Sequence, residues 1–527
     1  MVRGCGALGG VARHAMTGPS LRHRIGFAAT VVGLFMAILD IQIVSASLAE
    51  VQAGLSAAPD EASWIQTSYL IAEIVMIPLS GFLSRAISSR LLFTLSCAGF
   101  TIFSAACALA DSLPAMVIAR ALQGFTGGAM IPVCFSTSFL LYPGANRVKI
   151  SVLISLTATL APTIGPSLGG WLTQALSWHW LFLINLPIGA VVGITVWLTL
   201  DIDRPEPGLL ARFDWWGLLF MAGFLGSAEY VMEEGPRWGW FDDREITELA
   251  MLCALCGALF LWRAFTRPEP IIELRAFRNR NFLMGCVLSC IVGVGLFGLV
   301  YVLPLFFARV RGYDSMQIGE TLFITGLCMF LSAPIAGRLA RLMDMRLLLV
   351  LGMLLFMVSC LWIAQLTALS GFWEMAVPLG LRGTALIFMF MPINQIAFGT
   401  LPPAEIKNAA ALYNLMRNLG GAVGLAAINS IVTWRGAAHR QHLAEGVGWA
   451  RPNVQPWLDN LASRIALVQP DLPADLVALR RLQGLVQREA LILAYNDVLV
   501  LMAMLFLIAI PCVAIVSRPR SGPGGGH

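Results

Sequence analysis

The stretch PLSGFLSRAISSRLL, residues 78–92, occurs a second time in the chain as PIAGRLARLMDMRLL, residues 334–348. Seven residues are identical, and each recurs 256 positions later. Each copy closes one apolar block and opens the loop before the next block. The duplication therefore predicts two related halves, and internal repeats in an apolar chain are typical of membrane transporters.

The chain around these copies is too apolar for a soluble protein. Of its 527 residues, 58% are hydrophobic and 12% are charged, whereas soluble domains carry about 25% charged residues. The apolar residues form fourteen blocks of about 20 residues, the length that crosses a bilayer as a helix. We expect the spans near 26–47, 63–83, 90–109, 114–142, 149–172, 179–200, 215–232, 246–266, 281–308, 317–340, 346–367, 373–400, 407–434 and 490–516.

The positions of Lys and Arg predict the orientation, because cytoplasmic loops retain these residues. With the N-terminus inside, the inner segments hold 21 of them and the short outer loops hold four. We therefore expect both termini in the cytoplasm and both copies of the repeat running from outside to inside. The halves would then be parallel repeats related about the membrane normal, as in major facilitators.

These expectations define an all-α polytopic membrane protein of two parallel six-helix repeats plus two inserted helices, spans 7 and 8, an arrangement that resembles the major facilitator fold. The expected parts are a cytoplasmic tail (1–25), an N-terminal six-helix half (26–200), the inserted pair with its linkers (201–280), a C-terminal six-helix half (281–516) with an outer loop (435–489), and a cytoplasmic tail (517–527).

Other functional classes find no support in the sequence. No Lys/Arg-rich run indicates nucleic-acid binding. Cys253 and Cys256 have a C-x-x-C spacing, but they lie inside an apolar block without partner ligands, so we expect buried small residues and no metal site. A phosphate-binding G-x-x-x-x-G-K-[ST] loop and an H-E-x-x-H motif are both absent, so we expect neither ATP hydrolysis by that route nor an enzyme.

Ionisable residues inside spans are costly and usually face a bundle interior or an aqueous cavity. Asp40 in span 1 and Arg120 in span 4 both lie about 10 Å below the outer membrane surface at a rise of about 1.5 Å per residue. Desolvation disfavours the charged carboxyl and a nearby Arg favours it, so Asp40 can gain and lose a proton. The alternative is a fixed pair that only orients helices. The remaining intramembrane ionisable residues are Glu73, Glu229, Arg382 and Arg417.

Two of these carboxyl groups lead to different expectations. Glu73 lies near the middle of span 2 and is a third candidate for proton coupling, although a structural role is equally open. Glu229 lies near the outer end of span 7, where we expect its side chain to reach the membrane interface rather than to serve transport.

Span 5 contains the run APTIGPSLGG at residues 161–170. Proline kinks a helix, and glycine lets neighbouring backbones approach closely. The run therefore predicts either a packing groove or a hinge and seal between rocking halves. Its special residues are Pro162, Gly165, Pro166, Gly169 and Gly170.

These features resemble the major facilitator superfamily, and within it the 14-span drug:proton antiporters of the EmrB/QacA type, over roughly residues 26–516. Residues 165–170 match the antiporter signature G-P-x-x-G-G. Residues 178–189 are similar to W-R-W-x-F-x-I-N-x-P-x-G, with His179 in place of Arg, and residues 120–128 follow R-x-x-Q-G-x-G-x-x with the second Gly displaced by one. The span-1 motif keeps Asp40, but Gln42 and several neighbours differ.

The inner-loop motif G-x-L-a-D-r-x-G-r-k is matched less well. Gly81 is present, but Arg85 stands at the acidic position, so the family's charge relay between the halves cannot be carried over. The second copy has Asp344 three residues after Arg341. The expected gating residues of the two inner loops are Gly81, Arg85, Arg90, Gly337, Arg341 and Asp344.

The resemblance implies export of amphipathic or hydrophobic compounds in exchange for protons, with no cofactor and with Asp40 and Arg120 as the coupling pair. It implies a substrate cavity lined by spans 1, 4, 9 and 12, which would gather Gln42, Gln123, Arg382, Asn394 and Gln395. It also implies a bacterial cytoplasmic membrane, with a periplasmic adaptor and an outer-membrane channel as partners of the outer loop. A symporter or uniporter of a small metabolite is the alternative on the same fold.

Overall fold

The computed structural model describes residues 19–58, 61–142, 146–365, 367, 369–448, 451–468, 471 and 473–516. Its regular structure within these ranges is entirely helical. Most of the expected N-terminal tail and the whole expected tail 517–527 lie outside the described residues.

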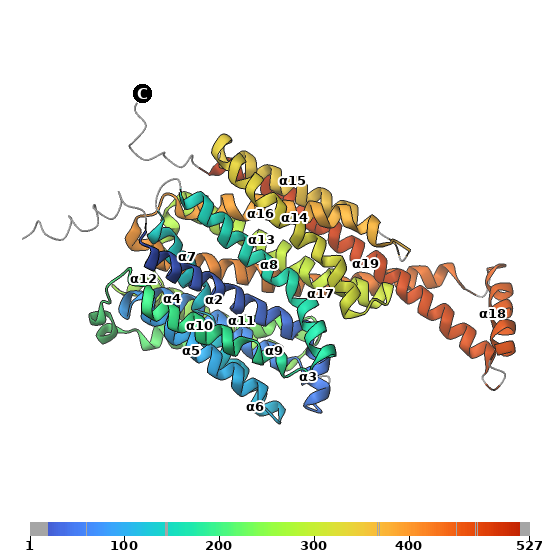
Figure 1. Cartoon of the computed structure of the whole chain (residues 1–527). Helices are drawn as coiled ribbons and strands as arrows, with labels where there is room; N and C mark the ends of the chain where they lie inside the picture. Colours follow the sequence, from blue (N-terminus) through green and yellow to red (C-terminus); the bar gives the residue numbers. More distant parts are fainter. Residues whose placement is uncertain are drawn as a thin grey trace, which may run out of the picture.

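The N-terminal half and the inserted pair follow each other along the chain (Figure 1). The N-terminal helices are α2 (Leu21–Ala46), α3 (Leu48–Gly54), α4 (Trp64–Ala86), α5 (Ser89–Ala108), α6 (Leu113–Gly127), α7 (Met130–Leu141), α8 (Asn146–Ala175), α9 (Trp180–Leu183) and α10 (Asn185–Thr199). The inserted helices are α11 (Trp215–Glu234) and α12 (Arg244–Thr266).

The C-terminal half contains longer helices. They are α13 (Arg280–Phe306), α14 (Ser315–Leu342), α15 (Met345–Ile363), α16 (Phe372–Phe398), α17 (Ile406–Gly446), α18 (Val454–Val468) and α19 (Ala474–Ile515). Short 3-10 turns lie at Pro207–Arg212, Trp240–Asp242, Leu274–Arg278 and Pro403–Glu405, and a π turn at Phe307–Arg311 follows α13.

Thirteen helical segments of the described chain are long and apolar enough to cross a membrane. The remaining predicted span is α11, a 20-residue helix whose outer end carries three Glu residues. The number fourteen therefore stays a prediction. Span 4 is divided into α6 and α7, and span 6 into α9 and α10.

The two halves meet through the duplicated stretches. Gly81 of α4 lies against α17, where an added Cβ would be 3.1 Å from the Ala411 side chain. In the second copy, Gly337 of α14 faces Val152 of α8, with an added Cβ 3.7 Å away. Each copy thus packs against the opposite half, the arrangement expected of parallel repeats.

The inserted helices pack against each other and border the contact between the halves. α11 contacts α4 of the N-terminal half and α17 of the C-terminal half. α12 lies outside α11, and only Ile246, Gly257 and Phe260 are buried along its length. One inserted helix is therefore part of the bundle interior, and the other presents an apolar surface.

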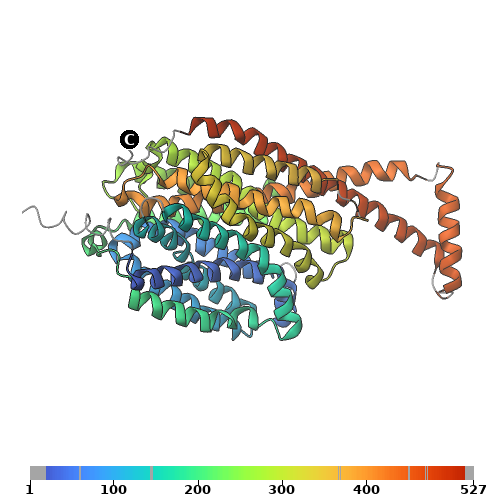
Figure 2. The same cartoon turned by 45° about the horizontal axis from the view of Figure 1, so that its top comes forward.

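The expected outer loop 435–489 is largely helical in the described residues, which corrects the sequence analysis. α17 and α19 continue beyond the bundle as a hairpin, with α18 across its tip (Figures 1 and 2). Leu479, Leu482 and Val486 recur at helical spacing and line a groove against α17. Apolar pairing between two amphipathic helices explains why they extend past the lipid.

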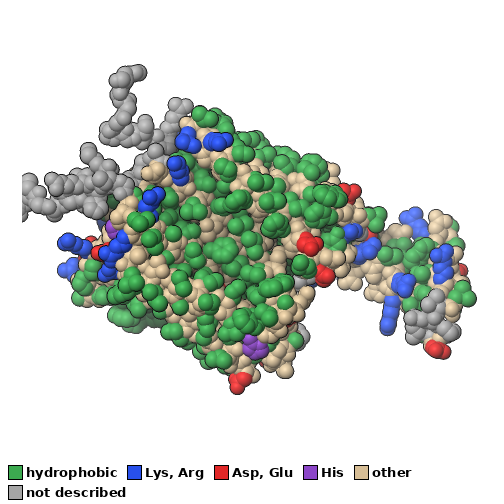
Figure 3. All heavy atoms as spheres, in the orientation of Figure 1, with side chains coloured by type: hydrophobic (Ala, Val, Ile, Leu, Met, Phe, Trp, Pro, Cys, Tyr) green, Lys and Arg blue, Asp and Glu red, His purple; other side chains and the backbone are tan. Residues whose placement is uncertain are grey.

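α2 begins and α19 ends at the same end of the bundle, which we call the inner end; the hairpin leaves from the outer end (Figures 1 and 2). In Figure 3, Lys and Arg side chains gather along the inner end, next to a broad hydrophobic surface. This distribution agrees with the predicted cytoplasmic position of the inner end.

Candidate functional site

Asp40 of α2 lies at the centre of a buried polar network in the N-terminal half. Its Oδ2 accepts a hydrogen bond from Arg120 Nη1 at 2.7 Å, and both side chains are fully buried. Its Oδ1 accepts from Gln123 Nε2 at 3.1 Å and from Asn185 Nδ2 at 2.7 Å. The sequence-predicted pair therefore forms, and three donors surround one carboxyl group.

Arg120 makes further contacts that hold it beside Asp40. Its Nε donates to the Ile65 carbonyl at 3.2 Å, and its Nη1 also donates to Gln123 Oε1 at 2.8 Å. Its guanidinium lies 4.1 Å from the centre of the Tyr69 ring, a cation-π distance. Among the described residues, Nη2 has no hydrogen-bond partner.

Asn185 is a member of the network to which the sequence analysis assigned no role. Its Nδ2 contacts Ser104 Oγ at 3.1 Å as well as Asp40, and Ser104 Oγ in turn donates to the Phe182 carbonyl at 2.9 Å. The motif at residues 178–189 contained Asn185, but only the fold shows that α10 brings it to α2.

Glycines in span 4 allow this network to form. An added Cβ on Gly128 would lie 2.8 Å from the Glu73 carbonyl oxygen, and one on Gly124 would overlap the Tyr69 backbone. α6 therefore approaches α4 backbone to backbone, which a larger side chain would prevent. This close contact places Arg120 over the Tyr69 ring.

Glycines in span 5 bring α8 equally close to α2. An added Cβ on Gly169 would lie 2.8 Å from the Ile43 carbonyl oxygen, and one on Gly165 would overlap Gln42. Gly170 is buried, and α8 continues through Pro162 and Pro166, both of which line a central cavity. The structure thus supports the interpretation of this run as a packing groove, while its role as a hinge stays a prediction.

The cavity has a volume of about 900 Å³ and lies between the halves. That size is within the range of small-molecule sites. Residues at the outer end of several helices line it, among them Ser63, Gln174 and Asp314, and Glu73 lies deeper. The cavity therefore extends to the outer end of the bundle.

The five residues predicted to line a substrate cavity are not all brought together. Gln42 lines the central cavity, whereas Gln123 belongs to the Asp40 network. Arg382 is 1% exposed within α16 and does not line the cavity. Asn394 and Gln395 contact α8, as described below.

Two further ionisable residues do line the cavity. Glu73 comes from α4 of the N-terminal half and Arg417 from α17 of the C-terminal half, and both are buried. Glu73 thus lies outside the Asp40 network. It lines the cavity, whereas Asp40 does not.

Polar contacts join the halves at the inner end. Arg85 forms an ion pair with Glu273, which precedes the C-terminal half, and Asn408 donates to the Glu273 carbonyl at 2.9 Å. Lys407 of α17 pairs with Asp203 and also donates to the Ser84 carbonyl at 2.8 Å. An ion pair is therefore present at this position, although Arg85 stands where the family's inner-loop motif has an acidic residue.

α16 adds to the same closure. Gln395 Nε2 donates to Ser151 Oγ at 2.6 Å, and Asn394 Nδ2 donates to Ser155 Oγ at 3.1 Å, so both residues connect α16 to α8. The Phe398 ring lies 4.6 Å from Phe139, centre to centre. With the cavity at the outer end, these contacts define an outward-facing arrangement.

The other inner-loop residues make more local contacts. Arg90 lies 3.8 Å from Asp201. In the second copy, Arg341 Nε donates to the Gly337 carbonyl at 3.2 Å, and Asp344 begins α15 by accepting from the Arg346 backbone at 3.0 Å. These hydrogen bonds of Arg341 and Asp344 stay within the C-terminal half, unlike the ion pair of Arg85 with Glu273.

Comparison with known proteins identifies the family. The model of the Major Facilitator Superfamily matches residues 30–425. The chain belongs to this superfamily. It is thus a multi-pass membrane transporter and not an enzyme, as the sequence predicted.

Relatives of this major facilitator match it along nearly its whole length. It is 38% identical to the colistin resistance protein EmrB of Acinetobacter baumannii, over 92% of this chain and 94% of the relative. It is 30% identical to the multidrug export protein EmrB of Escherichia coli K12, over 93% and 95%. The fatty acid resistance protein FarB of Neisseria gonorrhoeae is 29% identical over 94% and 96%.

A solved structure shares the fold. The crystal structure of the human organic anion transporter MFSD10 aligns with a TM-score of 0.56 at 13% identity and covers 92% of this chain and 99% of that chain. At this identity the likeness supports the major facilitator fold alone.

Proposed function

We propose that this transporter exports amphipathic or hydrophobic compounds in exchange for protons. The observation that carries the proposal is the fully buried contact of Asp40 with Arg120, Gln123 and Asn185, close to a cavity that extends to the outer end. The names of the export and resistance proteins that resemble the chain support the direction of transport.

Asp40 would couple protons to the movement of the halves by exchanging its partners. A proton on the carboxyl group removes the attraction to Arg120 and leaves the buried guanidinium without its acid. Arg120 and Gln123 must then find new partners, and this rearrangement favours another packing of α2 and α6. Glu73, which lines the cavity from α4, would give protons a polar site on the way from the outer end.

The membrane potential supplies enough energy for this exchange. Moving one charge across 100 mV releases about 2.3 kcal/mol, and a tenfold concentration ratio requires about 1.4 kcal/mol. One proton at that potential could therefore hold a substrate gradient of roughly fortyfold. In this proposal the proton is the coupling ion and no cofactor takes part.

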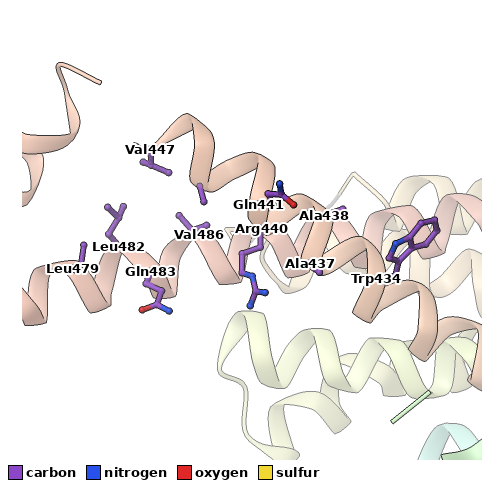
Figure 4. A pocket seen from close by; sticks show the side chains of 11 residues that line it. Trp434, Ala437, Ala438, Arg440, Gln441, Val447, Leu479, Leu482, Gln483 and Val486 are labelled. Carbon is purple, nitrogen blue, oxygen red and sulfur yellow. The ribbon is translucent and has the colours of Figure 1, made fainter. Parts of the chain in front are cut away.

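The proposed location is a bacterial cytoplasmic membrane, with the hairpin of α17 and α19 on the periplasmic side. Between these helices lies a groove of about 630 Å³, lined from both sides (Figure 4). Trp434, Leu479 and Val486 are among its residues. A largely apolar groove beyond the lipid, with Arg440 and Gln483 also in its lining, suits a periplasmic adaptor that carries the compound onward to an outer-membrane channel.

The proposal is tested with purified protein in liposomes, where an imposed proton gradient drives transport of a fluorescent amphipathic compound. Asp40→Asn keeps the size of the side chain but cannot release a proton. We expect this variant to insert and bind the compound but to lose gradient-driven transport. Asp459→Asn, on the exposed hairpin helix α18, is the matched control and should transport normally.

Three results would contradict the proposal. Unchanged gradient-driven transport by Asp40→Asn would remove the coupling role of Asp40. Movement of compound and protons in the same direction would identify a symporter, and transport independent of the gradient would identify a uniporter.

A further inference from the structure

The inserted helix α11 carries acidic residues into the central cavity. Glu229 is 5% exposed, and Glu229, Glu233 and Glu234 all line the cavity. The sequence analysis expected Glu229 to reach the membrane interface, and this expectation is wrong. α11 packs on α4 and α17, so the face that bears these carboxyl groups points between the halves.

Glu229 has no cationic partner among the described residues. Its Oε2 makes no hydrogen bond, and Glu233 and Glu73, which line the same cavity, are both acidic. Glu229 and Glu233 are four residues apart on one helix, a spacing at which like charges destabilise each other. A buried carboxylate without a partner is also costly. This arrangement therefore fits a cation that comes from outside the chain.

The Arg residues of the cavity do not fill this role. Arg417 donates to Asn414 and lies over the Phe135 ring at 5.4 Å. Arg237 lies 3.6 Å from Glu234. Arg309 lies on the π turn after α13, and no ion pair joins it to α11 in the described part of the chain. Glu229 and Glu233 thus remain available to a cation from outside the chain.

Another part of the cavity wall is apolar and aromatic. Phe297, Val300 and Tyr301 of α13 line the same cavity. Aromatic faces attract organic cations, and apolar side chains accommodate the hydrocarbon part of such a ligand. The combination of unpaired carboxyl groups and rings in one cavity matches an amphipathic cation better than an anion.

We propose that Glu229 and Glu233 of the inserted helix bind the positive group of a lipophilic organic cation in the central cavity. This inference rests on the proposed function, because it assigns a substrate class to the transport cavity. It also gives the inserted helices a role in recognition.

The test is equilibrium binding to the full-length protein in detergent at one fixed pH, without a proton gradient. The probes are tetraphenylphosphonium and the uncharged triphenylphosphine oxide, which share the aromatic groups but differ in charge. Glu229→Gln and Glu233→Gln should each weaken tetraphenylphosphonium binding about tenfold, which corresponds to about 1.4 kcal/mol. Binding of the oxide should not change.

Two variants serve as controls. Glu229→Asp keeps the charge and should retain most of the affinity for the cation. Glu248→Gln removes an exposed acid of α12 that pairs with Arg244 outside the cavity, and it should bind both probes normally.

Three results would overturn this assignment: no binding of tetraphenylphosphonium to the unmodified protein, equal loss of both probes in Glu229→Gln, or unchanged cation binding in both Gln variants. Because binding needs no gradient, the proposed function can fail separately. Binding of the cation through Glu229 without exchange for protons would contradict the proposed export function but would agree with the proposed binding site.

Discussion

Arg85, in the last turn of α4, forms an ion pair with Glu273, 188 residues away in the segment that leads into the C-terminal half. In the family's inner-loop motif this position is acidic, so here the sign is reversed and the partner comes from a linker. Together with the pair of Lys407 and Asp203, this contact ties the halves together at the inner end while the cavity extends to the outer end.

The first prediction concerns this pair. Glu273→Ala should weaken the inner closure and shift the population toward the inward-facing state. The two side chains are 22% and 35% exposed, so the pair contributes about 1 kcal/mol at most. That value corresponds to a change of about fivefold in the ratio of states, measurable as a change in the distance between spin labels placed across the inner end.

A charge exchange provides the control for this measurement. Arg85→Glu and Glu273→Arg should each disturb the closure, and the double variant should restore much of it. Glu269→Ala removes the acid of a neighbouring exposed pair with Arg212 and should have no effect. If the inner closure of the double variant were no better than the added effects of the two single variants predict, the two residues would act independently.

The second prediction concerns Asn185, which donates a hydrogen bond to Asp40 Oδ1 at 2.7 Å. A hydrogen bond to a charged group contributes about 1.5–3 kcal/mol. Asn185→Ala should therefore disturb the coupling network and reduce proton-driven transport at least about tenfold in liposomes. Asn460→Ala, on the exposed hairpin helix, should transport at the normal rate. Normal transport by Asn185→Ala would exclude this amide from the coupling network.

The sequence was sufficient to predict that Asp40 and Arg120 lie at the same depth, because counting residues from the end of a span gives the depth of a side chain, whereas their pairing was implied by the family resemblance. It was not sufficient for Glu229, because depth says nothing about which side of a helix faces the interior. That direction depends on the contacts of α11 with α4 and α17, which join distant parts of the chain. For the same reason the partner of Arg85 could not be predicted.

The hairpin shows a second limit of sequence reasoning. The apolar blocks ended near 434 and began again near 490, and the sequence analysis expected a loop between them. The helices continue because apolar residues on α17 and α19 face each other, and because Asp497 accepts hydrogen bonds from Arg435 and His439 at 2.6 and 2.7 Å. Membrane hydropathy detects lipid contact and does not detect this pairing.

The third prediction concerns the contact of α8 with α2. Gly169→Ala would place a Cβ 2.8 Å from the Ile43 carbonyl oxygen and 2.9 Å from Ser47 Oγ, so the backbones must separate. Overpacking of this kind costs about 1–3 kcal/mol. The variant should melt at a lower temperature than the unmodified protein in detergent.

Gly484→Ala is the matched control for that substitution. Gly484 also lies within a helix, but nothing lies within 4 Å of an added Cβ. Because Ala favours helix more than Gly does, this variant should be as stable as the unmodified protein or slightly more stable. Equal melting temperatures for the two variants would contradict the close approach of α8 and α2.

The fourth prediction separates transport from partner binding. Val486 lines the groove between α17 and α19, whereas its neighbour Leu485 does not. Val486→Arg replaces an apolar side chain of the groove with a long charged one, adds to the charge of Arg440 and should weaken the docking of the proposed periplasmic adaptor. A double-membraned bacterium that expresses this variant should therefore lose most of its resistance to exported compounds. In liposomes, which contain no adaptor, the variant should transport normally. Leu485→Arg carries the same charge outside the groove and should behave normally in both assays. If Val486→Arg also failed in liposomes, the groove would serve the folding or transport of the chain itself; if it conferred full resistance in cells, an adaptor would have to bind elsewhere.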